Sequence, residues 1–314
     1  MDHPHVSGMA GADAKMGLRR LLPWWSRMAA KMFLARMPIP YGWWRALGIF
    51  RHGDMHDPVH AHKVFRHHLQ RAFNGGLPRQ GFTCLELGPG DSLLSGLVAR
   101  AQGASRVYMV DAGDYVVRDI EPYRRMIGVL RNAGTPVPEA ETAASIDELL
   151  AACNIVYLTD GIQSLSEIPT SSVDYVWSQV VLEHVPKVQF QDMLFQLHRV
   201  MRDDAMGSHS VDLRDHLGGG LNNLRFSDRT WEGDFFRDSG FYTNRIRYSE
   251  MLVMMEQAGF QIDVVRTQCW ETLPTPRSVM ARPYALLDED ELRVAEFEIL
   301  MRPRSKEASL TVSG

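Results

Sequence analysis

An apolar strand that runs into a glycine turn constrains the fold of this chain most. Residues 82–91 read Phe-Thr-Cys-Leu-Glu-Leu-Gly-Pro-Gly-Asp. The apolar run suits a parallel strand that is buried on both faces. Gly88 and Gly90 allow backbone angles, and a close approach by a ligand, that a β-carbon would obstruct. The segment therefore predicts the first strand and the nucleotide-binding turn of an α/β sheet.

Acidic residues surround this turn. A second apolar run, residues 106–110, ends in Asp111, where a carboxylate at a strand tip can accept hydrogen bonds from both hydroxyls of a ribose. Glu86 lies below the turn, where it could position an ammonium group, and Asp91 could cap the next helix. Ser92 stands where a dinucleotide motif usually has a third glycine, and the negative charge beside it repels phosphate. We therefore predict a cationic nucleoside ligand.

The turn resembles the first motif of class I S-adenosylmethionine-dependent methyltransferases. That motif is an acidic residue, an apolar residue and G-x-G, as in Glu-Leu-Gly-Pro-Gly at 86–90. Residues 173–185 resemble the family's fourth strand and the loop that closes over the methyl donor, with the Leu-Glu-His-Val ending of many small-molecule members. The resemblance implies S-adenosylmethionine as cofactor. The cofactor-binding residues that it implies are Glu86, Gly88, Gly90, Asp91, Asp111, Asp160, Gly161 and Ser178.

The assignment of Asp160 and Gly161 has an alternative. They follow an expected strand at 155–158, where the family reads the adenine amino group with an acid. A plain surface turn explains an Asp-Gly pair equally well.

Strands and helices alternate from residue 81 onward, which predicts a doubly wound, Rossmann-like α/β fold. The resemblance implies a seven-stranded, mostly parallel sheet whose last strand is antiparallel. We read residues 136–148 as an insertion and the glycine-rich, aromatic segment 218–242 as a substrate lid. The expected strands are 82–87, 106–110, 155–158, 173–179, 207–213, 261–265 and 294–301. The expected helices are 92–102, 119–133, 190–201 and 249–258, with another beginning near residue 182.

The chain divides into three predicted parts. Residues 1–75 form a basic, Trp- and His-rich helical extension, residues 76–304 the methyltransferase domain with its lid at 218–242, and residues 305–314 a flexible tail. The three cysteines have no paired spacing, which argues against a disulfide framework or a zinc knuckle. No apolar run approaches the ~20 residues that span a bilayer, and no signal-peptide core is present, so we expect a cytoplasmic protein.

The extension carries eleven Lys or Arg against four Asp or Glu, and four tryptophans at positions 24, 25, 43 and 44. Basic residues beside tryptophan suit an anionic membrane surface, so residues 1–50 could make a peripheral membrane contact. The favoured alternative is a helical cap that buries these tryptophans, because tryptophan is buried on average. We expect no nucleic acid as partner.

Transfer of a methyl group to a hydroxyl needs fixed in-line geometry and a base. Alternation along the fifth strand places Asp212, Arg214 and His216 on one face as the strand leaves the sheet. His216, oriented by Asp212, is therefore the leading candidate for the base, and His184 is the second. A polar loop residue without a catalytic role remains the alternative for each histidine.

The pair Glu183-His184 also resembles the end of a Glu-x-x-Glu-His metal site found in certain methyltransferases of quinone biosynthesis and of small-RNA ends. Val180 replaces the first glutamate. Because one carboxylate is lost, we expect no metal, although Asp212 or His216 could substitute for it.

The acceptor is predicted from the lid and the residues that follow it. The candidate substrate residues are Asn223, Arg225, Tyr242 and Arg245, although ordinary salt bridges explain the two arginines as well. Sequence segments such as Asp-Leu-Arg-Asp-His-Leu resemble those of bacterial methyltransferases found with surface-polysaccharide synthesis. This resemblance implies a small-molecule or glycan hydroxyl as acceptor. The alternatives are an NAD(P)-dependent oxidoreductase on a similar sheet and a non-catalytic ligand-binding scaffold.

Overall fold

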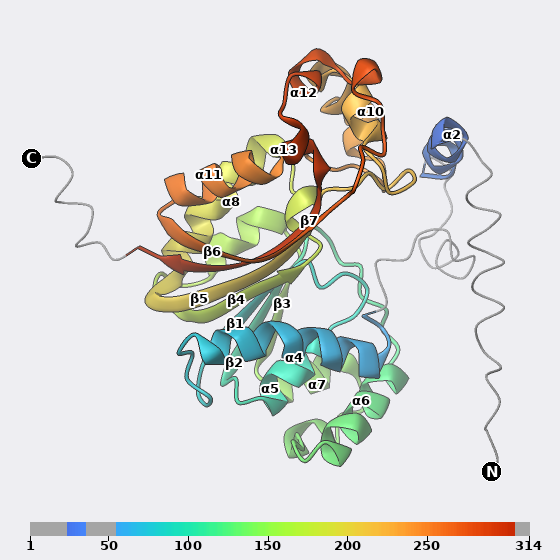
Figure 1. Cartoon of the computed structure of the whole chain (residues 1–314). Coiled ribbons are helices and arrows are strands. Elements are labelled where there is room, and N and C mark those ends of the chain that lie inside the picture. The colour runs from blue at the N-terminus through green and yellow to red at the C-terminus, as the bar shows by residue number, and fades with distance from the viewer. Residues whose placement is uncertain (1–23, 36–54, 305–314) are drawn as a thin grey trace, which may run out of the picture.

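A single seven-stranded sheet organises the protein, whose computed structural model describes residues 24–35 and 55–304 (Figure 1). The strand order is β3-β2-β1-β4-β5-β7-β6, and β7 runs antiparallel to both of its neighbours. This topology confirms the predicted doubly wound, Rossmann-like fold with an antiparallel last strand. The strands are β1 (Thr83–Leu87), β2 (Arg106–Val110), β3 (Ile155–Leu158), β4 (Val173–Gln179), β5 (Met201–Asp212), β6 (Phe260–Cys269) and β7 (Val294–Pro303).

Helices cover both faces of the sheet (Figure 1). One layer contains α4 (Pro58–Asn74), α5 (Leu94–Ala101), α6 (Glu121–Asn132) and α7 (Ile146–Ala152), and the other contains α8 (Lys187–Val200) and α11 (Tyr248–Gln257). Short helices of the segment 218–242, the predicted lid, follow β5: η4 (Asn222–Arg225), α9 (Asp228–Trp231) and α10 (Asp234–Arg237). Between β6 and β7 lie η5 (Arg277–Val279), α12 (Arg282–Ala285) and α13 (Glu289–Arg293).

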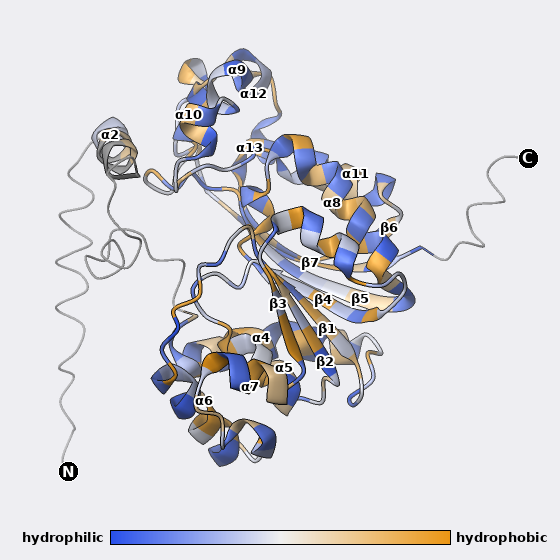
Figure 2. Cartoon of the chain, turned by 180° about the vertical axis from the view of Figure 1, so that it is seen from behind, coloured by the Kyte–Doolittle hydropathy of each residue, from blue (hydrophilic) through white to orange (hydrophobic). Residues whose placement is uncertain are grey.

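Strands β1, β2 and β3 consist mostly of hydrophobic residues, whereas the helices around the sheet carry many hydrophilic residues (Figure 2). This distribution is typical of a parallel sheet between two helical layers, where each strand is buried twice. Helix α4 contributes directly to this core, because Phe65 is fully buried and its ring meets the ring of Trp177 edge-on, 5.2 Å between centroids. The helix lies within the predicted extension 1–75, yet it packs as part of the sheet domain.

Local chemistry explains where the helices begin. Asp57 caps α4 by accepting a hydrogen bond from the His60 amide at 2.7 Å, and Pro58 occupies the first turn. Ser145 caps α7 in the same way, while the Glu148 carboxylate accepts from the Ala144 amide. The start of α7 therefore lies inside the segment 136–148, which was predicted to be an insertion, and η1 (Pro138–Ala140) lies there too.

Two expectations about helix starts were wrong. Helix α5 begins at Leu94 with Leu93 as its N-cap and no side-chain cap, so Asp91 does not cap it. The helix expected near residue 182 is only the 3-10 turn η3 (Leu182–His184), and α8 begins later, at Lys187.

Helix α2 (Trp24–Ala35) packs against the lid. The Trp24 ring meets the Phe226 ring edge-on at 6.2 Å, and the Arg225 guanidinium lies 4.9 Å from the centre of the Trp24 ring. Met32 is buried in the same cluster. Trp24 thus follows the cap interpretation, whereas Trp25 is 58% exposed. Trp43, Trp44, most of residues 1–50 and the tail 305–314 lie outside the described residues. No described helix combines the length and the apolar character that crossing a membrane requires.

Candidate functional site

The glycine turn after β1 brings three strand ends together. Gly88 and Gly90 have φ angles of 65° and 71°, in the left-handed region that favours glycine. The Gly88 amide donates to the Val110 carbonyl at the tip of β2, at 2.8 Å. A β-carbon on Gly88 would lie 2.6 Å from the side chain of Val181, in the loop that follows β4. The turn is therefore held closely between β2 and the β4 loop.

Asp111 fixes this turn from the tip of β2. Its Oδ2 atom accepts a hydrogen bond from the Gly90 amide and its Oδ1 atom one from the Ala112 amide, both at 2.7 Å. Its backbone carbonyl accepts from Gly161 at 2.8 Å, which brings the tip of β3 and exposed Asp160 beside it. Both carboxylate oxygens of Asp111 therefore bind backbone amides at the ligand-facing end of the sheet.

Two further carboxyl groups are buried around the turn. Glu86 is 3% exposed and accepts a hydrogen bond from the Ser95 hydroxyl at 2.5 Å. Burial raises the pKa of Glu86 to about 8; the Ser95 hydrogen bond lowers it and the charge on Asp111 raises it further. Asp91 is 4% exposed, and its Oδ1 atom has no hydrogen-bond partner among the described residues. This concentration of buried acid favours a cationic ligand and disfavours a pyrophosphate.

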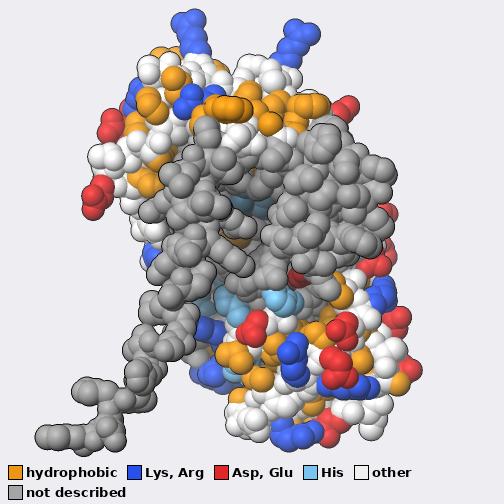
Figure 3. Space-filling model, turned by 90° about the vertical axis from the view of Figure 1, so that its right-hand side faces the viewer, with side chains coloured by type: hydrophobic (Ala, Val, Ile, Leu, Met, Phe, Trp, Pro, Cys, Tyr) orange, Lys and Arg blue, Asp and Glu red, His pale blue; other side chains and the backbone are white. Residues whose placement is uncertain are grey.

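A second group of side chains lies at the ends of β4 and β5. One ligand atom from each of Glu183, His184 and His216 lies within 4.8 Å of the other two. The two imidazole rings are 4.8 Å apart and tilted by 32°. On the face shown in Figure 3, histidine side chains gather near the middle of the molecule. The structure therefore brings together both histidines that the sequence proposed as bases, and adds Glu183 to them.

His184 and Glu183 each have defined hydrogen-bond partners. The His184 Nδ1 atom lies 2.8 Å from the Tyr242 carbonyl, which only accepts, so Nδ1 carries the proton and Nε2 points elsewhere. Glu183 is 1% exposed; its Oε1 atom accepts from the Asp212 amide at 3.1 Å, and its Oε2 atom has no hydrogen-bond partner among the residues described. Burial raises the pKa of Glu183 well above its ordinary value.

Asn244 holds the backbone of η3 in place. Its side-chain amide donates to the carbonyls of Leu182 and Val185 at 2.8 and 2.9 Å, and its own backbone amide donates to the Glu183 carbonyl at 2.7 Å. Asn244 is completely buried. The position of Glu183 and His184 thus depends on a residue about sixty positions later in the chain.

Asp212 and Ser178 each have a side-chain partner within the protein. The Asp212 carboxylate receives two hydrogen bonds from the Arg214 guanidinium, both at 2.9 Å. Ser178 is fully buried, and its hydroxyl lies 2.7 Å from His209 Nδ1. Burial lowers the pKa of His209 to about 3, so this histidine is neutral.

Sequence reasoning missed a related histidine in α4. His68 is fully buried, with Nδ1 at 2.8 Å from the Ser208 hydroxyl and Nε2 at 2.8 Å from the Gln179 side-chain oxygen. Burial lowers its pKa to about 4. A signal was available, because His68 shares the apolar face of α4 with Phe65 and Leu69 at helical spacing.

The four predicted substrate residues all lie in or beside the lid, and their side chains bind other residues of the protein. Arg245 is 3% exposed and donates to Asp228 at 2.6 Å and to Glu232 at 3.4 Å. The Tyr242 hydroxyl donates to Glu232 at 2.7 Å. Asn223 is 2% exposed and donates to the Thr243 hydroxyl, whereas half-buried Arg225 donates to Asn222 and lies over Trp24. These hydrogen bonds and ion pairs hold the lid residues in fixed positions relative to one another.

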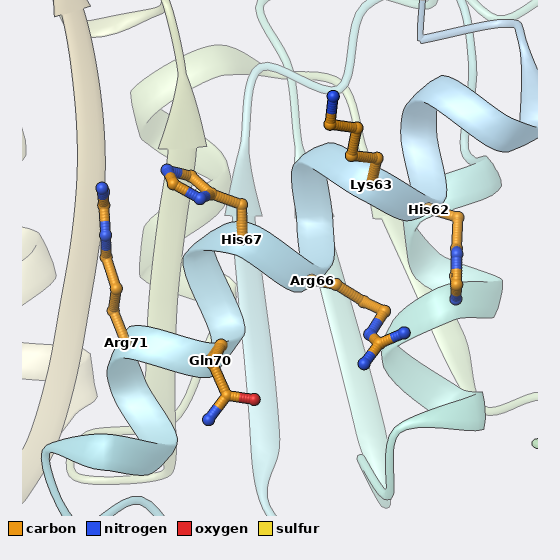
Figure 4. A pocket seen from close by; sticks show the side chains of 6 residues that line it. All are labelled: His62, Lys63, Arg66, His67, Gln70 and Arg71. Carbon is orange, nitrogen blue, oxygen red and sulfur yellow. The ribbon is translucent and has the colours of Figure 1, made fainter.

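The outer face of α4 carries a basic hollow of about 510 Å³ (Figure 4). Arg71 pairs with Glu298, whereas Lys63 and Arg66 form no ion pair with the described residues. The remaining side chains of the hollow are His62, His67 and Gln70.

Replacing Gly88 by alanine tests the close contact at the turn. The added β-carbon would meet Val181 and would hold an unfavourable φ, so we expect a loss of about 1–3 kcal/mol in the free energy of unfolding, measured by urea denaturation. The double variant G88A/V181A should recover part of that loss. Gly128, in α6, has nothing within 4 Å of an added β-carbon, so Gly128→Ala is the matched control. An unchanged stability in G88A would contradict the described contact.

Comparisons with known proteins give likeness in structure only. No family model matches the chain, and no curated protein matches it. A solved S-adenosylmethionine-dependent methyltransferase from Methanosarcina mazei is 14% identical, with a TM-score of 0.45 over 74% of this chain and 98% of that one. A second, from Mesorhizobium loti, is 17% identical, with a TM-score of 0.39 over 74% and 96%. A chain of the complex between the Haloferax volcanii Trm112 methyltransferase activator and a methyltransferase is 14% identical, with a TM-score of 0.42 over 79% and 93%. The fold assignment rests on the strand order.

Proposed function

We propose that this chain is an S-adenosylmethionine-dependent methyltransferase that acts on a hydroxyl of a small molecule or glycan. The observation that carries the proposal is the acid-lined glycine turn. Glu86, Asp91 and Asp111 surround it, and one oxygen of buried Asp91 lacks a partner among the described residues. Burying a carboxyl group in this way is unfavourable unless a partner compensates it, and a cationic ligand would do so.

The residues present fit S-adenosylmethionine. Asp111 places a carboxylate at the tip of β2, where a ribose would lie, Gly88 and Gly90 leave space for close approach, and the carboxyl groups match a ligand that carries sulfonium and ammonium charges. The bound cofactor would supply a methyl group on a positively charged sulfur. What the protein itself does is orient the acceptor, and Glu183, His184 and His216 lie at the neighbouring strand ends for that purpose.

Calorimetry with the demethylated product, S-adenosylhomocysteine, tests the donor site directly. We expect binding heat with this ligand and none with NAD. The reverse result would favour an oxidoreductase, and heat with neither ligand would refute the proposal.

Replacing Asp111 by asparagine should weaken S-adenosylhomocysteine binding by roughly tenfold to a hundredfold, because a hydrogen bond to a charged group is worth about 1.5–3 kcal/mol. The matched control is Asp114→Asn, which changes a side chain that is 49% exposed and paired with Arg118. Circular dichroism and thermal melting of each variant separate a binding defect from unfolding. Equal affinity in the wild type and D111N would exclude this carboxylate as the ribose acceptor.

The acceptor class and the location in the cell belong to the same proposal. The lid between β5 and α11 supports an acceptor bound against His184, since the Tyr242 carbonyl contacts that ring. Exposed Trp25 and the unpaired cations Lys63 and Arg66 of the described segments support a peripheral contact with an anionic membrane surface. A glycan acceptor from surface-polysaccharide synthesis would be assembled at such a surface.

A further inference from the structure

Three potential ligand groups converge at the ends of β4 and β5 from two separate segments. Glu183 and His184 belong to η3, and His216 follows β5. Their ligand atoms lie within 4.8 Å of one another. Metal–ligand distances of about 2.0–2.2 Å place neighbouring ligand atoms roughly 3–4 Å apart, so small side-chain rotations would close the arrangement around one ion.

The surroundings of the group are those of a built site. Metal-binding histidines generally donate their second ring N–H to a carbonyl or carboxylate, which fixes the tautomer. His184 has this arrangement, with Nδ1 against the Tyr242 carbonyl at 2.8 Å. The Glu183 carboxyl is oriented by the Asp212 amide through Oε1, and its other oxygen is buried and has no partner in the described part of the chain.

We propose that Glu183, His184 and His216 bind one divalent first-row transition-metal ion. Two imidazole nitrogens and one carboxylate oxygen favour ions such as Zn²⁺, Co²⁺ or Mn²⁺, whereas Mg²⁺ prefers a shell of oxygen ligands. Because Glu183 is buried while His184 is exposed and His216 half-buried, an ion bound there would keep coordination positions open towards solvent.

The role of the ion rests on the proposed function. An ion at this position would bind the acceptor hydroxyl and lower its pKa, as a Lewis acid does for bound water. The O–C bond would form while the S–C bond breaks, with the electron pair of that bond left on sulfur and the hydroxyl proton passing to solvent. Metal binding itself does not depend on this role.

Titration of the full chain with Zn²⁺ and Co²⁺ after removal of metal by chelator tests the proposal, with Mg²⁺ as the comparison ion. We expect one equivalent of Zn²⁺ or Co²⁺ to bind, with weaker binding of Mg²⁺, and the bound Co²⁺ to give a visible absorption band. Glu183→Gln and His216→Ala should each weaken binding by roughly tenfold or more. Glu183→Gln keeps the oxygen that accepts from the Asp212 amide, so it serves where His216→Ala fails to fold.

Control variants separate this site from the histidines of α4. The double variant His62→Ala/His67→Ala removes two imidazoles from the basic hollow. It should still bind one equivalent of Zn²⁺ or Co²⁺ with wild-type affinity. The proposal would be overturned if E183Q and H216A both bound the metal ion with wild-type affinity. It would also be overturned if the α4 double variant lost the bound metal ion. Titrating S-adenosylhomocysteine into the same chelated protein keeps the two proposals apart, because intact donor binding without metal binding refutes only the metal site.

Discussion

Glu86→Gln should make the protein more stable at pH 8 and should flatten the dependence of its stability on pH. Glu86 is 3% exposed, and burial raises its pKa from the ordinary 4.5 to about 8. The unfolded chain therefore releases this proton near pH 4.5, whereas the folded chain keeps it until about pH 8. Stability linked to Glu86 is fully present below about pH 4.5 and is lost as the pH rises to about 8.

The size of the effect follows from the shift in pKa. Each unit corresponds to about 1.4 kcal/mol, so the wild type should lose on the order of 3–5 kcal/mol over this window. Glutamine has no proton to release, and the Ser95 hydroxyl can still donate to its oxygen. At pH 8 we expect the melting temperature of E86Q to exceed that of the wild type by roughly 5 °C or more.

Melting curves between pH 5 and pH 8.5 measure this difference, and Glu121→Gln is the matched control because Glu121 is exposed and pairs with Arg124. The same carboxyl links folding to ligand binding. A cationic ligand beside Glu86 lowers its pKa, so the wild type should release a proton on binding S-adenosylmethionine at pH 7, and E86Q should release less. Calorimetry in buffers of different ionisation heat measures that proton. Parallel pH profiles for E86Q and the wild type would show that Glu86 does not titrate as described.

Asn244→Ala should be the most destabilising single substitution that we consider. The side chain serves the carbonyls of Leu182 and Val185 and accepts from the Ile246 amide at 3.0 Å. Alanine removes the partner of all three backbone groups, two of them buried and one part-buried, and each buried group left without a partner costs about 1–3 kcal/mol. We expect the free energy of unfolding, measured by urea denaturation, to fall by about 3–5 kcal/mol.

The control for this substitution is Asn74→Ala, because Asn74 is exposed at the end of α4, where its side chain accepts a hydrogen bond from exposed Gln70. It should change stability by less than about 0.5 kcal/mol. Asn244→Ala should also impair the Glu183–His184–His216 cluster more than the donor turn, since Asn244 binds η3 and not β1. A loss below about 1 kcal/mol would mean that η3 holds its shape without this residue.

The sheet could be predicted from the sequence because its signals are local. Buried parallel strands such as 82–87 are continuous apolar runs, and the glycine turn and Asp111 identify the switch from strand to ligand site. Helix α4 was harder to place, since its eight polar or charged outer positions suggested a separate basic arm, while its apolar stripe gives no information about which surface covers it.

The acceptor side could be predicted only in part. Alternation predicted Asp212 and His216 on one face, but it could not show that Arg214 binds both oxygens of Asp212. Nor could it show that Asn244 anchors η3 across sixty residues, or that Arg245 is a buried brace of the lid. These roles depend on tertiary contacts, for which a single sequence carries no spacing rule.

The contact between Gly88 and Val181 has a thermodynamic consequence. Val181 lies against the glycine turn of the proposed donor site, and it lies two residues before Glu183 in the same short loop. A methyl donor that shifts Val181 would also shift the carboxyl group of Glu183. Linkage between two ligands is reciprocal. If the bound donor changes the affinity of the Glu183 cluster for its ligand by some factor, that ligand must change the affinity for the donor by the same factor.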